Sequence, residues 1–171
     1  MVPTPASNAG ARSASRRSGS ESRPNLTGMA QSVLPDSSTP FGERVRRRLR
    51  DDIVAWLTTV GDDGAPQPNP VWFWWDGETF LVYNRADAHR LRHVRTRPLV
   101  ALNFDGDGRG GDIVVVVGRA ELTEREPASH EVPEYVAKYG QRMTRIAGSP
   151  AGFSAAYPVP MRIHPLKLRG H

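Results

Sequence analysis

The chain has 171 residues, 38% of them hydrophobic, which suits one domain with a core or a smaller domain with a tail. No uninterrupted apolar run is longer than about five residues, so the sequence excludes a membrane-spanning helix of roughly 20 residues. The lack of cysteine excludes disulfides, thiol catalysis, iron–sulfur clusters and cysteine-based zinc sites. We therefore expect a soluble protein.

The net charge of +5 and the pI of about 10.2 raise the question of nucleic-acid binding, so the position of the charge matters. Residues 1–50 hold nine arginines against three acidic residues, a net charge of +6. Residues 51–171 hold 14 basic and 15 acidic groups, a net charge of −1. The excess of basic groups belongs to the N-terminal segment, and the remainder of the chain is nearly neutral.

Residues 1–38 are rich in serine, alanine, proline, glycine and arginine and contain no aromatic residue. Such a segment buries too little apolar surface to offset its ordering entropy, so we expect a disordered tail. Two other interpretations remain open. The arginine- and serine-rich start resembles a transit sequence, and Met29 is an alternative start of translation.

Ordered structure is expected from residue 39 onward, in a single domain over residues 39–171. Thr39 is suited to cap a helix, and Pro40 suits its first position. Phe41, Val45 and Leu49 then follow on one stripe, which predicts a short amphipathic helix. Its other face carries the arginines between residues 44 and 50, which are either solvated or available to an anion.

Alternating apolar residues and tight turns follow in close succession, as in a β-meander. Helices are predicted over residues 88–95 and 132–143. The predicted strands are residues 53–60, 67–75, 79–84, 100–104, 113–122 and 158–168. Six short strands with few helices predict a mainly β fold, namely an antiparallel barrel.

Three motifs match known sites by their letters alone. Residues 106–111 read G-x-G-x-x-G, but a strand follows where a dinucleotide site needs a helix. Residues 105–116 imitate a calcium loop, but Arg109 and Val116 occupy ligand positions. His89 and His93 have the spacing of zinc ligands on a helix, but arginines surround them. We therefore expect a flexible hairpin loop and no metal site.

One combination of segments does favour a function. The strand 67–75 is rich in proline and aromatic residues, Tyr83 and Asn84 follow, and the predicted helix and the residues after it then carry clustered cations. Apolar strand surface beside cations suits a flat conjugated ring with a phosphorylated side chain. The alternative interpretation is that the tryptophans belong to the core and the arginines to a solvated helix face.

These segments resemble the pyridoxamine 5′-phosphate oxidase-like split-barrel family, in particular the actinobacterial flavin and deazaflavin oxidoreductases that use coenzyme F420 or FMN. The resemblance covers residues 49–169. It rests on residues 55–60, 64–67, 70–73, 83–98, 118–122 and 162–170. It implies a homodimer of six-stranded split β-barrels of the FMN-binding, Greek-key type, with a cofactor at each end of the dimer interface.

The resemblance also implies a set of binding residues. Those expected at the ring are Asn69, Pro70, Val71 and Trp72. Those expected at the ribityl chain are Tyr83 and Asn84, and those expected at the phosphate are Ala88, His89 and Arg90. Trp72, Trp74 and Tyr157 are candidates for a substrate wall. The chain departs from the family in having Arg90 in place of lysine, His93 in place of asparagine and Ala88 in place of a hydroxyl residue.

The function implied is hydride transfer between reduced F420 and a small conjugated acceptor, in a cytoplasmic protein that binds neither nucleic acid nor membrane. The cofactor carries the chemistry, so no side chain is assigned as catalytic. The alternatives are an FMN-dependent oxidoreductase, a non-catalytic carrier of flavin or deazaflavin, and a nucleic-acid binder that uses the arginine-rich segment. The arginines at residues 44–50 are a further candidate contact for an acidic cofactor tail.

Overall fold

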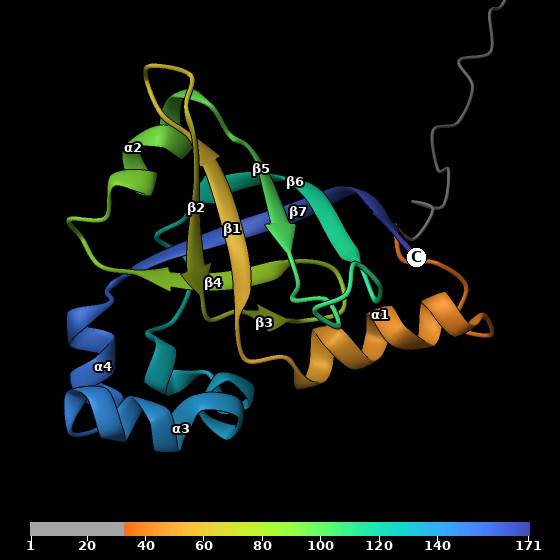
Figure 1. Cartoon of the computed structure of the whole chain (residues 1–171). Coiled ribbons are helices and arrows are strands. Elements are labelled where there is room, and N and C mark those ends of the chain that lie inside the picture. Colours follow the sequence, from red (N-terminus) through yellow and green to blue (C-terminus); the bar gives the residue numbers. More distant parts are fainter. Residues whose placement is uncertain (1–32) are drawn as a thin grey trace, which may run out of the picture. The chain divides into compact units, whose positions relative to one another are not determined.

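The computed structural model describes residues 33–171, and its seven strands form one antiparallel sheet in the order β2-β1-β5-β6-β7-β4-β3 (Figure 1). The strands are β1 (Ala55–Val60), β2 (Pro66–Val71), β3 (Trp74–Trp75), β4 (Phe80–Asn84), β5 (Leu99–Asn103), β6 (Val114–Leu122) and β7 (Val159–Gly170). The helices are α1 (Pro40–Asp51), α2 (His89–Thr96), the 3-10 turn η1 (Ser129–Glu131), α3 (Pro133–Ala147) and α4 (Pro150–Ala156). The predicted mainly β antiparallel fold with short helices is confirmed.

Most of the predicted tail, including Met29, lies outside the described residues. Of residues 33–38, Leu34 packs against the main apolar core of the protein. The Asp36 carbonyl oxygen accepts hydrogen bonds from the Thr39 amide and hydroxyl. The Thr39 hydroxyl in turn accepts from the Gly42 amide, which caps α1 as predicted. The described structure therefore makes its first contacts a few residues before Thr39.

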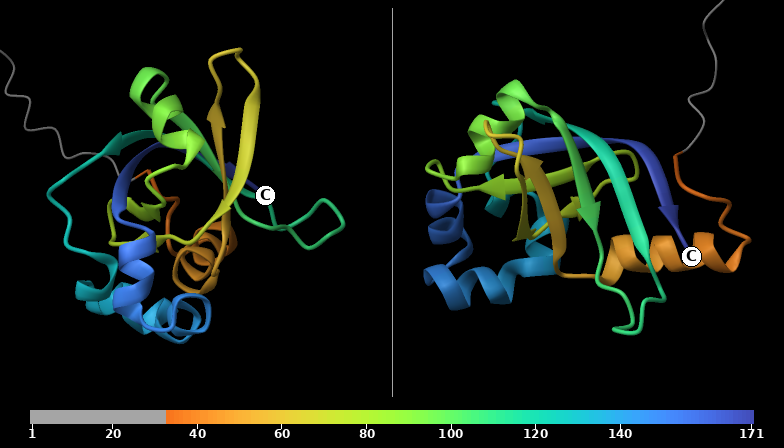
Figure 2. Two further views of the ribbon diagram at one scale, coloured as in Figure 1. Left: turned by 90° about the vertical axis from the view of Figure 1, so that its left-hand side faces the viewer. Right: turned by 45° about the horizontal axis from the view of Figure 1, so that its top comes forward.

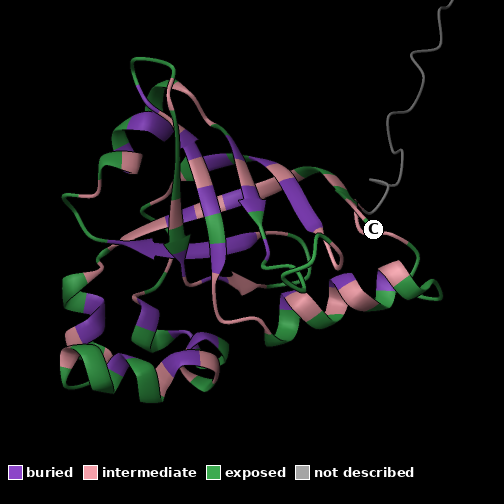
Figure 3. Cartoon of the chain, in the orientation of Figure 1, coloured by how far each residue is buried: buried purple, intermediate pink, exposed green. Residues whose placement is uncertain are grey.

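The sheet curls around one apolar core, the barrel core, and its longest strands are β6 and β7. The members of the barrel core are Val45, Leu49, Ala55, Leu57, Val71, Phe73, Phe80, Val82, Val94, Val100, Leu102, Phe104, Val114, Val116, Ala120, Met161 and Ile163. The register of β6 and β7 shifts between Val117 and Gly118, and Gly118 pairs with Pro165. A proline is tolerated at such a bulge because the ladder is already interrupted there. A Cβ atom at Gly118 would lie 2.8 Å from Ile163 Cγ2, so the close approach of the two strands requires glycine. Figure 3 shows the buried residues along the strands, with β4 buried over its whole length.

The prediction of one strand over residues 67–75 is wrong, because this segment forms two strands, β2 and β3. The backbone between them is bonded to a side chain instead of a neighbouring strand. The Phe73 amide donates to the Tyr139 hydroxyl at 3.0 Å, and that hydroxyl lies 2.8 Å from the Phe73 carbonyl oxygen. The sheet therefore has seven strands where six were predicted.

Helix α2 lies at one end of the curled sheet, and α1, α3 and α4 lie toward the other end (Figure 2). Helices α1 and α2 both place side chains in the barrel core. Helix α4 is absent from the sequence-based prediction, although Ser149 caps it and Pro150 occupies its first position. Helices α3 and α4 pack on one another and cover a second buried group, the aromatic cluster, which is separate from the barrel core. Its members are Leu81, Tyr83, Val132, Tyr135, Tyr139, Met143 and Phe153.

Candidate functional site

A cavity of about 220 Å³, the aromatic cavity, lies where the end of β2, strand β4 and helices α2, α3 and α4 meet. It brings together segments that are far apart in the sequence. Its wall is largely aromatic and contains one cation. The lining residues are Pro70, Val71, Trp72, Tyr83, Arg90, Tyr135, Ile146, Phe153 and Tyr157.

Four aromatic rings form a continuous stack beside this cavity. Trp72 lies between Tyr139 and Phe153, with ring centroids 4.8 and 5.2 Å apart and nearly parallel planes. Tyr157 continues the stack from Phe153 at 4.4 Å. Aromatic rings at these spacings attract one another through offset stacking, so the stack forms a firm apolar wall that ends at Tyr157. The rings of Trp72, Phe153 and Tyr157 all line the cavity.

Arg90 is the only charged side chain among those that line the cavity. Its Nε donates to Asn84 Oδ1 at 2.6 Å, and the fully buried Asn84 is fixed in turn because its Nδ2 donates to the Val159 carbonyl oxygen at 3.0 Å. Burial lowers the pKa of Arg90, and within residues 33–171 no carboxylate forms an ion pair with it. The structure thus holds an oriented cation that lacks a counter-charge.

Two tyrosine hydroxyls lie near the cavity in different circumstances. The Tyr83 hydroxyl donates to the Pro127 carbonyl oxygen at 2.8 Å, and burial raises its pKa to about 12. The Tyr135 hydroxyl is buried and has no hydrogen-bond partner among the described residues, and burial raises its pKa well above the ordinary value. Both phenols are therefore neutral at physiological pH.

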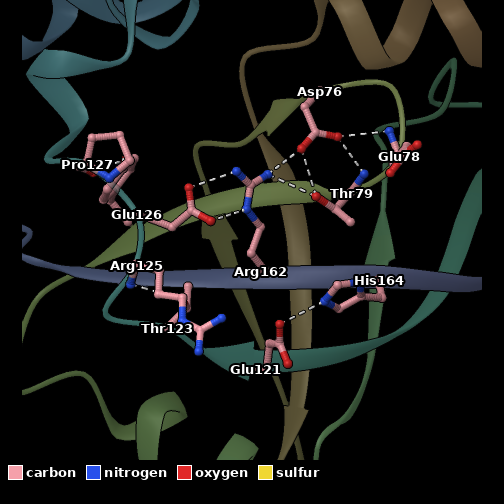
Figure 4. A network of polar contacts seen from close by, with 11 residues as sticks. Asp76, Glu78, Thr79, Glu121, Thr123, Arg125, Glu126, Pro127, Arg162 and His164 are labelled. Carbon is pink, nitrogen blue, oxygen red and sulfur yellow. Dashed lines mark hydrogen bonds and ion pairs between the residues drawn. The ribbon is translucent and has the colours of Figure 1, made fainter.

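An ion-pair network holds the loop that carries Pro127 (Figure 4). Arg162, on β7, contacts both carboxylate oxygens of Glu126 at 2.7 and 2.8 Å. It also contacts Asp76 and Thr79 at the β3–β4 turn. Because the Pro127 carbonyl oxygen accepts a hydrogen bond from the Tyr83 hydroxyl, this bidentate pair fixes one side of the cavity wall.

Of the predicted binding residues, six line the aromatic cavity: Pro70, Val71, Trp72, Tyr83, Arg90 and Tyr157. Asn84 does not line the cavity, but its Oδ1 accepts a hydrogen bond from Arg90 and so orients that side chain. Asn69 is half-buried on β2 and bonds to the Gln67 carbonyl oxygen, Ala88 precedes α2, and His89 is exposed at its first position. Trp74 lies away from this cavity and lines another one.

Three cavity residues are absent from the prediction: Tyr135, Ile146 and Phe153. All three belong to the helices α3 and α4, which lie between β6 and β7 in the sequence. The spacing of Tyr135, Tyr139 and Met143 predicts their helix, but equally suits plain core packing. The serine–proline pair at residues 149–150 is the signal that indicates α4.

The described residues also line two larger cavities, of which one is less suited to a phosphorylated ligand. One of about 800 Å³ is lined by Glu121, Glu124 and Glu126, which repel an anion. The other, of about 650 Å³, lies between α1 and α3, and its lining includes Trp74 and the cations Arg46, Arg50 and Lys138. The α1 arginines do not line the aromatic cavity, and Arg44 and Arg48 form ion pairs with Asp112.

The remaining sequence motifs behave as local structure. His93 is buried, and its Nδ1 lies 3.0 Å from the Thr59 hydroxyl, so it packs α2 against β1. Within the described part of the chain, no three histidine, aspartate or glutamate side chains are grouped as for a metal ion. The loop between β5 and β6 folds around Asp107, whose Oδ1 accepts from the amides of Arg109 and Gly111. Among residues 33–171, no helix has the length and apolar character needed to cross a bilayer.

A curled antiparallel sheet around one core, with short helices packed at its ends, defines a protein of the split-barrel class. The sequence profile of the pyridoxamine 5′-phosphate oxidase family matches residues 41–167. The chain therefore belongs to this family, as the sequence resemblance predicts. None of the curated protein sequences matches the chain.

Solved structures share the split-barrel fold at low sequence identity. A putative pyridoxamine 5′-phosphate oxidase from Listeria innocua is 23% identical with a TM-score of 0.56, over 74% of this chain and 94% of that one. An F420 reductase is 24% identical with a TM-score of 0.54, over 71% and 92%. The haem storage protein HutZ from Vibrio cholerae is 16% identical with a TM-score of 0.54, over 75% and 92%.

Members of this family typically bind a flavin, and the residues of the aromatic cavity fit such a group. The stacked rings offer a flat face, and Arg90 offers a cation for a phosphate. The buried, unpartnered Tyr135 hydroxyl offers a hydrogen-bond donor. A neighbouring cavity of about 230 Å³ shares Tyr83 and Tyr157 with the aromatic cavity, which extends the space for a side chain.

Proposed function

We propose that this protein is an F420-dependent oxidoreductase that transfers a hydride between the reduced deazaflavin and a small conjugated acceptor. The observation that carries the proposal is the stacked aromatic wall beside Arg90, a half-buried cation without a described carboxylate partner. A flat ring with a phosphorylated side chain is complementary to both features. Similarity to a solved F420 reductase supports the deazaflavin among such ligands.

In this proposal the protein binds and orients, and the deazaflavin, when bound, supplies the hydride chemistry. Arg90 binds the phosphate through its two terminal nitrogens, because Asn84 occupies Nε. Tyr157, at the end of the stack, presents apolar surface to the ring, and Trp72 contributes to the lining from within the stack. The apolar wall excludes water from the reacting face. No side chain of the cavity is required as a general acid or base.

We further propose that a second copy of the chain completes the site. The aromatic cavity of about 220 Å³ is smaller than the roughly 300–1,000 Å³ of small-molecule sites. The outer face of the sheet leaves Trp56 41% and Leu99 53% exposed, which is apolar surface suited to a second copy. Light scattering after size exclusion should give twice the chain mass, and a monomer that binds the cofactor at full affinity would contradict this proposal.

The test is to purify the full chain, record its absorption spectrum and titrate F420 and FMN separately. We expect F420 to bind, and its reduced form to be oxidised when quinones, enones or nitro-compounds are added. Binding of FMN instead of F420 would assign the alternative cofactor. Binding without turnover would assign a carrier, in line with the storage role named for HutZ. A chain that binds neither cofactor would overturn the proposal.

Two arginine variants test the phosphate contact. Arg90→Ala should weaken cofactor binding by about tenfold to a hundredfold, the usual range for a hydrogen-bonded charged group. Arg92→Ala is the matched control on the same helix, because Arg92 is 64% exposed and ion-paired with Asp62. Its affinity should equal that of the wild type. Equal affinities of the two variants would remove the phosphate role of Arg90.

A further inference from the structure

Two tyrosines of α3 occupy equally buried positions but differ in their hydrogen bonding. Tyr135 and Tyr139 are both 0% exposed, and their ring centroids lie 4.7 Å apart. The Tyr139 hydroxyl accepts from the Phe73 amide and lies within 2.9 Å of the carbonyl oxygens of Phe73 and Ile53. The Tyr135 hydroxyl has no partner among the described residues. The Tyr139 hydroxyl therefore has a structural role, and the Tyr135 hydroxyl has none within the described residues.

An unpartnered hydroxyl in the interior is unfavourable for folding. Leaving a buried polar group without a hydrogen bond costs about 1–3 kcal/mol, and most buried polar groups in proteins are bonded. Phenylalanine fills the same space without this cost. The Tyr135 hydroxyl thus lowers the stability of the ligand-free protein. We therefore expect its hydrogen-bond partner to be a ligand.

The position of Tyr135 indicates what that is. Tyr135 lines the aromatic cavity together with Arg90 and Tyr157, and its ring packs edge-on against Tyr83 at 5.1 Å. Burial keeps the phenol protonated, so the hydroxyl is a donor at physiological pH. The missing partner is therefore an acceptor atom, such as a ring carbonyl oxygen or a ring nitrogen.

The hydroxyl is closed to bulk solvent, so an acceptor reaches it from within the cavity after a small displacement of a lining side chain. Tyr157 is suited to this movement. It is half-buried, follows the last turn of α4, and its own hydroxyl forms no hydrogen bond to the described residues. When Tyr157 moves away from Phe153, a ring can lie between these two side chains, within the cavity that Tyr135 also lines.

We propose that Tyr135 is a ligand-binding residue whose hydroxyl donates a hydrogen bond to an acceptor on the planar ring of the ligand. This inference rests on the proposed function and deepens it. The aromatic cavity then requires two features of its ligand: an anionic group for Arg90 and a ring acceptor for Tyr135. A flat phosphorylated ligand whose ring lacks the acceptor binds less tightly.

The test compares Tyr135→Phe with Tyr139→Phe in the full chain, by titration of F420 and FMN and by thermal unfolding without ligand. Tyr135→Phe should raise the dissociation constant about three- to tenfold, the range for one hydrogen bond, and should leave the Tm equal or higher. Tyr139→Phe should lower the Tm, because it leaves the Phe73 amide unpartnered, and should leave the dissociation constant unchanged.

The bound ring supplies a readout that does not depend on activity. A hydrogen bond to a ring acceptor shifts the absorption of the bound cofactor, so the spectrum in Tyr135→Phe should move toward that of the free cofactor. Unchanged affinity and spectrum in Tyr135→Phe would overturn the inference, and so would a Tm as low as that of Tyr139→Phe. A wild type that binds neither cofactor would overturn the proposed function itself. Binding that is weakened in Arg90→Ala but not in Tyr135→Phe would overturn this inference alone.

Discussion

The barrel core and the aromatic cluster are both buried, but they differ in whether their side chains need hydrogen-bond partners. The barrel core is built from valine, leucine, isoleucine, methionine and phenylalanine, whose side chains need no hydrogen-bond partner. The aromatic cluster contains three tyrosines, each with an oxygen that has to be satisfied. Tyr83 and Tyr139 satisfy theirs within the protein, and Tyr135 does not. The barrel core therefore stabilises the protein without any polar cost. The aromatic cluster contains one unpartnered hydroxyl, that of Tyr135, which lowers stability at the cavity.

The largest effect is expected in the barrel core. Leu57 is 0% exposed on β1, and Leu57→Ala should lower the free energy of unfolding by about 2–5 kcal/mol through lost burial and the cavity left behind. Urea denaturation measures this loss. The folded fraction should bind the cofactor with wild-type affinity, because Leu57 does not line the aromatic cavity. A drop in affinity without a drop in stability would contradict the division into two regions.

A smaller effect is expected where the two regions are joined. Arg162→Met removes the bidentate pair with Glu126, which should lower the free energy of unfolding by about 1–3 kcal/mol. It should also speed amide exchange at residues 123–131 and weaken cofactor binding, because the Pro127 acceptor of Tyr83 loses its anchor. Glu121→Gln is the control, since Glu121 and His164 form an exposed pair nearby. Equal amide exchange rates in the two variants would show that the Arg162–Glu126 pair does not hold this loop in place.

The smallest effect concerns Lys138, which lies at the boundary between the regions. Its ammonium lies 3.9 Å from the ring centroid of Phe73 and 5.5 Å from that of Tyr139, and burial lowers its pKa to about 8. The unfolded chain keeps a proton that the native state releases above that pH. Stability from this group should therefore rise as the pH increases through about 8 toward the ordinary value of 10.5.

Urea denaturation of the wild type and of Lys138→Met, at several values from about pH 7 to about pH 9, isolates this contribution. The difference in unfolding free energy between the two proteins should change with pH in favour of the wild type. A constant difference would mean that the Lys138 ammonium is solvated in the native state.

Much of the barrel follows from the sequence, because its strands depend on local signals. The apolar run of β6 and the alternation along β1 predict buried strands directly. The capping of α1 by Thr39 is equally local, and the structure contains the bond that the sequence predicts. The binding residues of β4 and α2 are predicted through a family resemblance that covers this segment.

The aromatic side of the cavity does not follow in the same way, because it depends on contacts between distant residues. The break between β2 and β3 is made by the Tyr139 hydroxyl, which is 66 residues away from Phe73. Tyr135 is a candidate site residue because its hydroxyl lacks a hydrogen-bond partner among the described residues. The spacing of residues in the sequence does not reveal this. Helix α4 has seven residues, too few for a periodic apolar pattern to identify it.

Strand β2 forms one edge of the sheet and carries proline at every second position, at residues 66, 68 and 70. Successive residues of an edge strand alternate between facing the neighbouring strand and facing outward, so these prolines remove the amide donors along the outward side. A second chain that approaches this edge finds carbonyl oxygens without matching N–H groups. This edge of the sheet is thereby protected against edge-to-edge fibril growth.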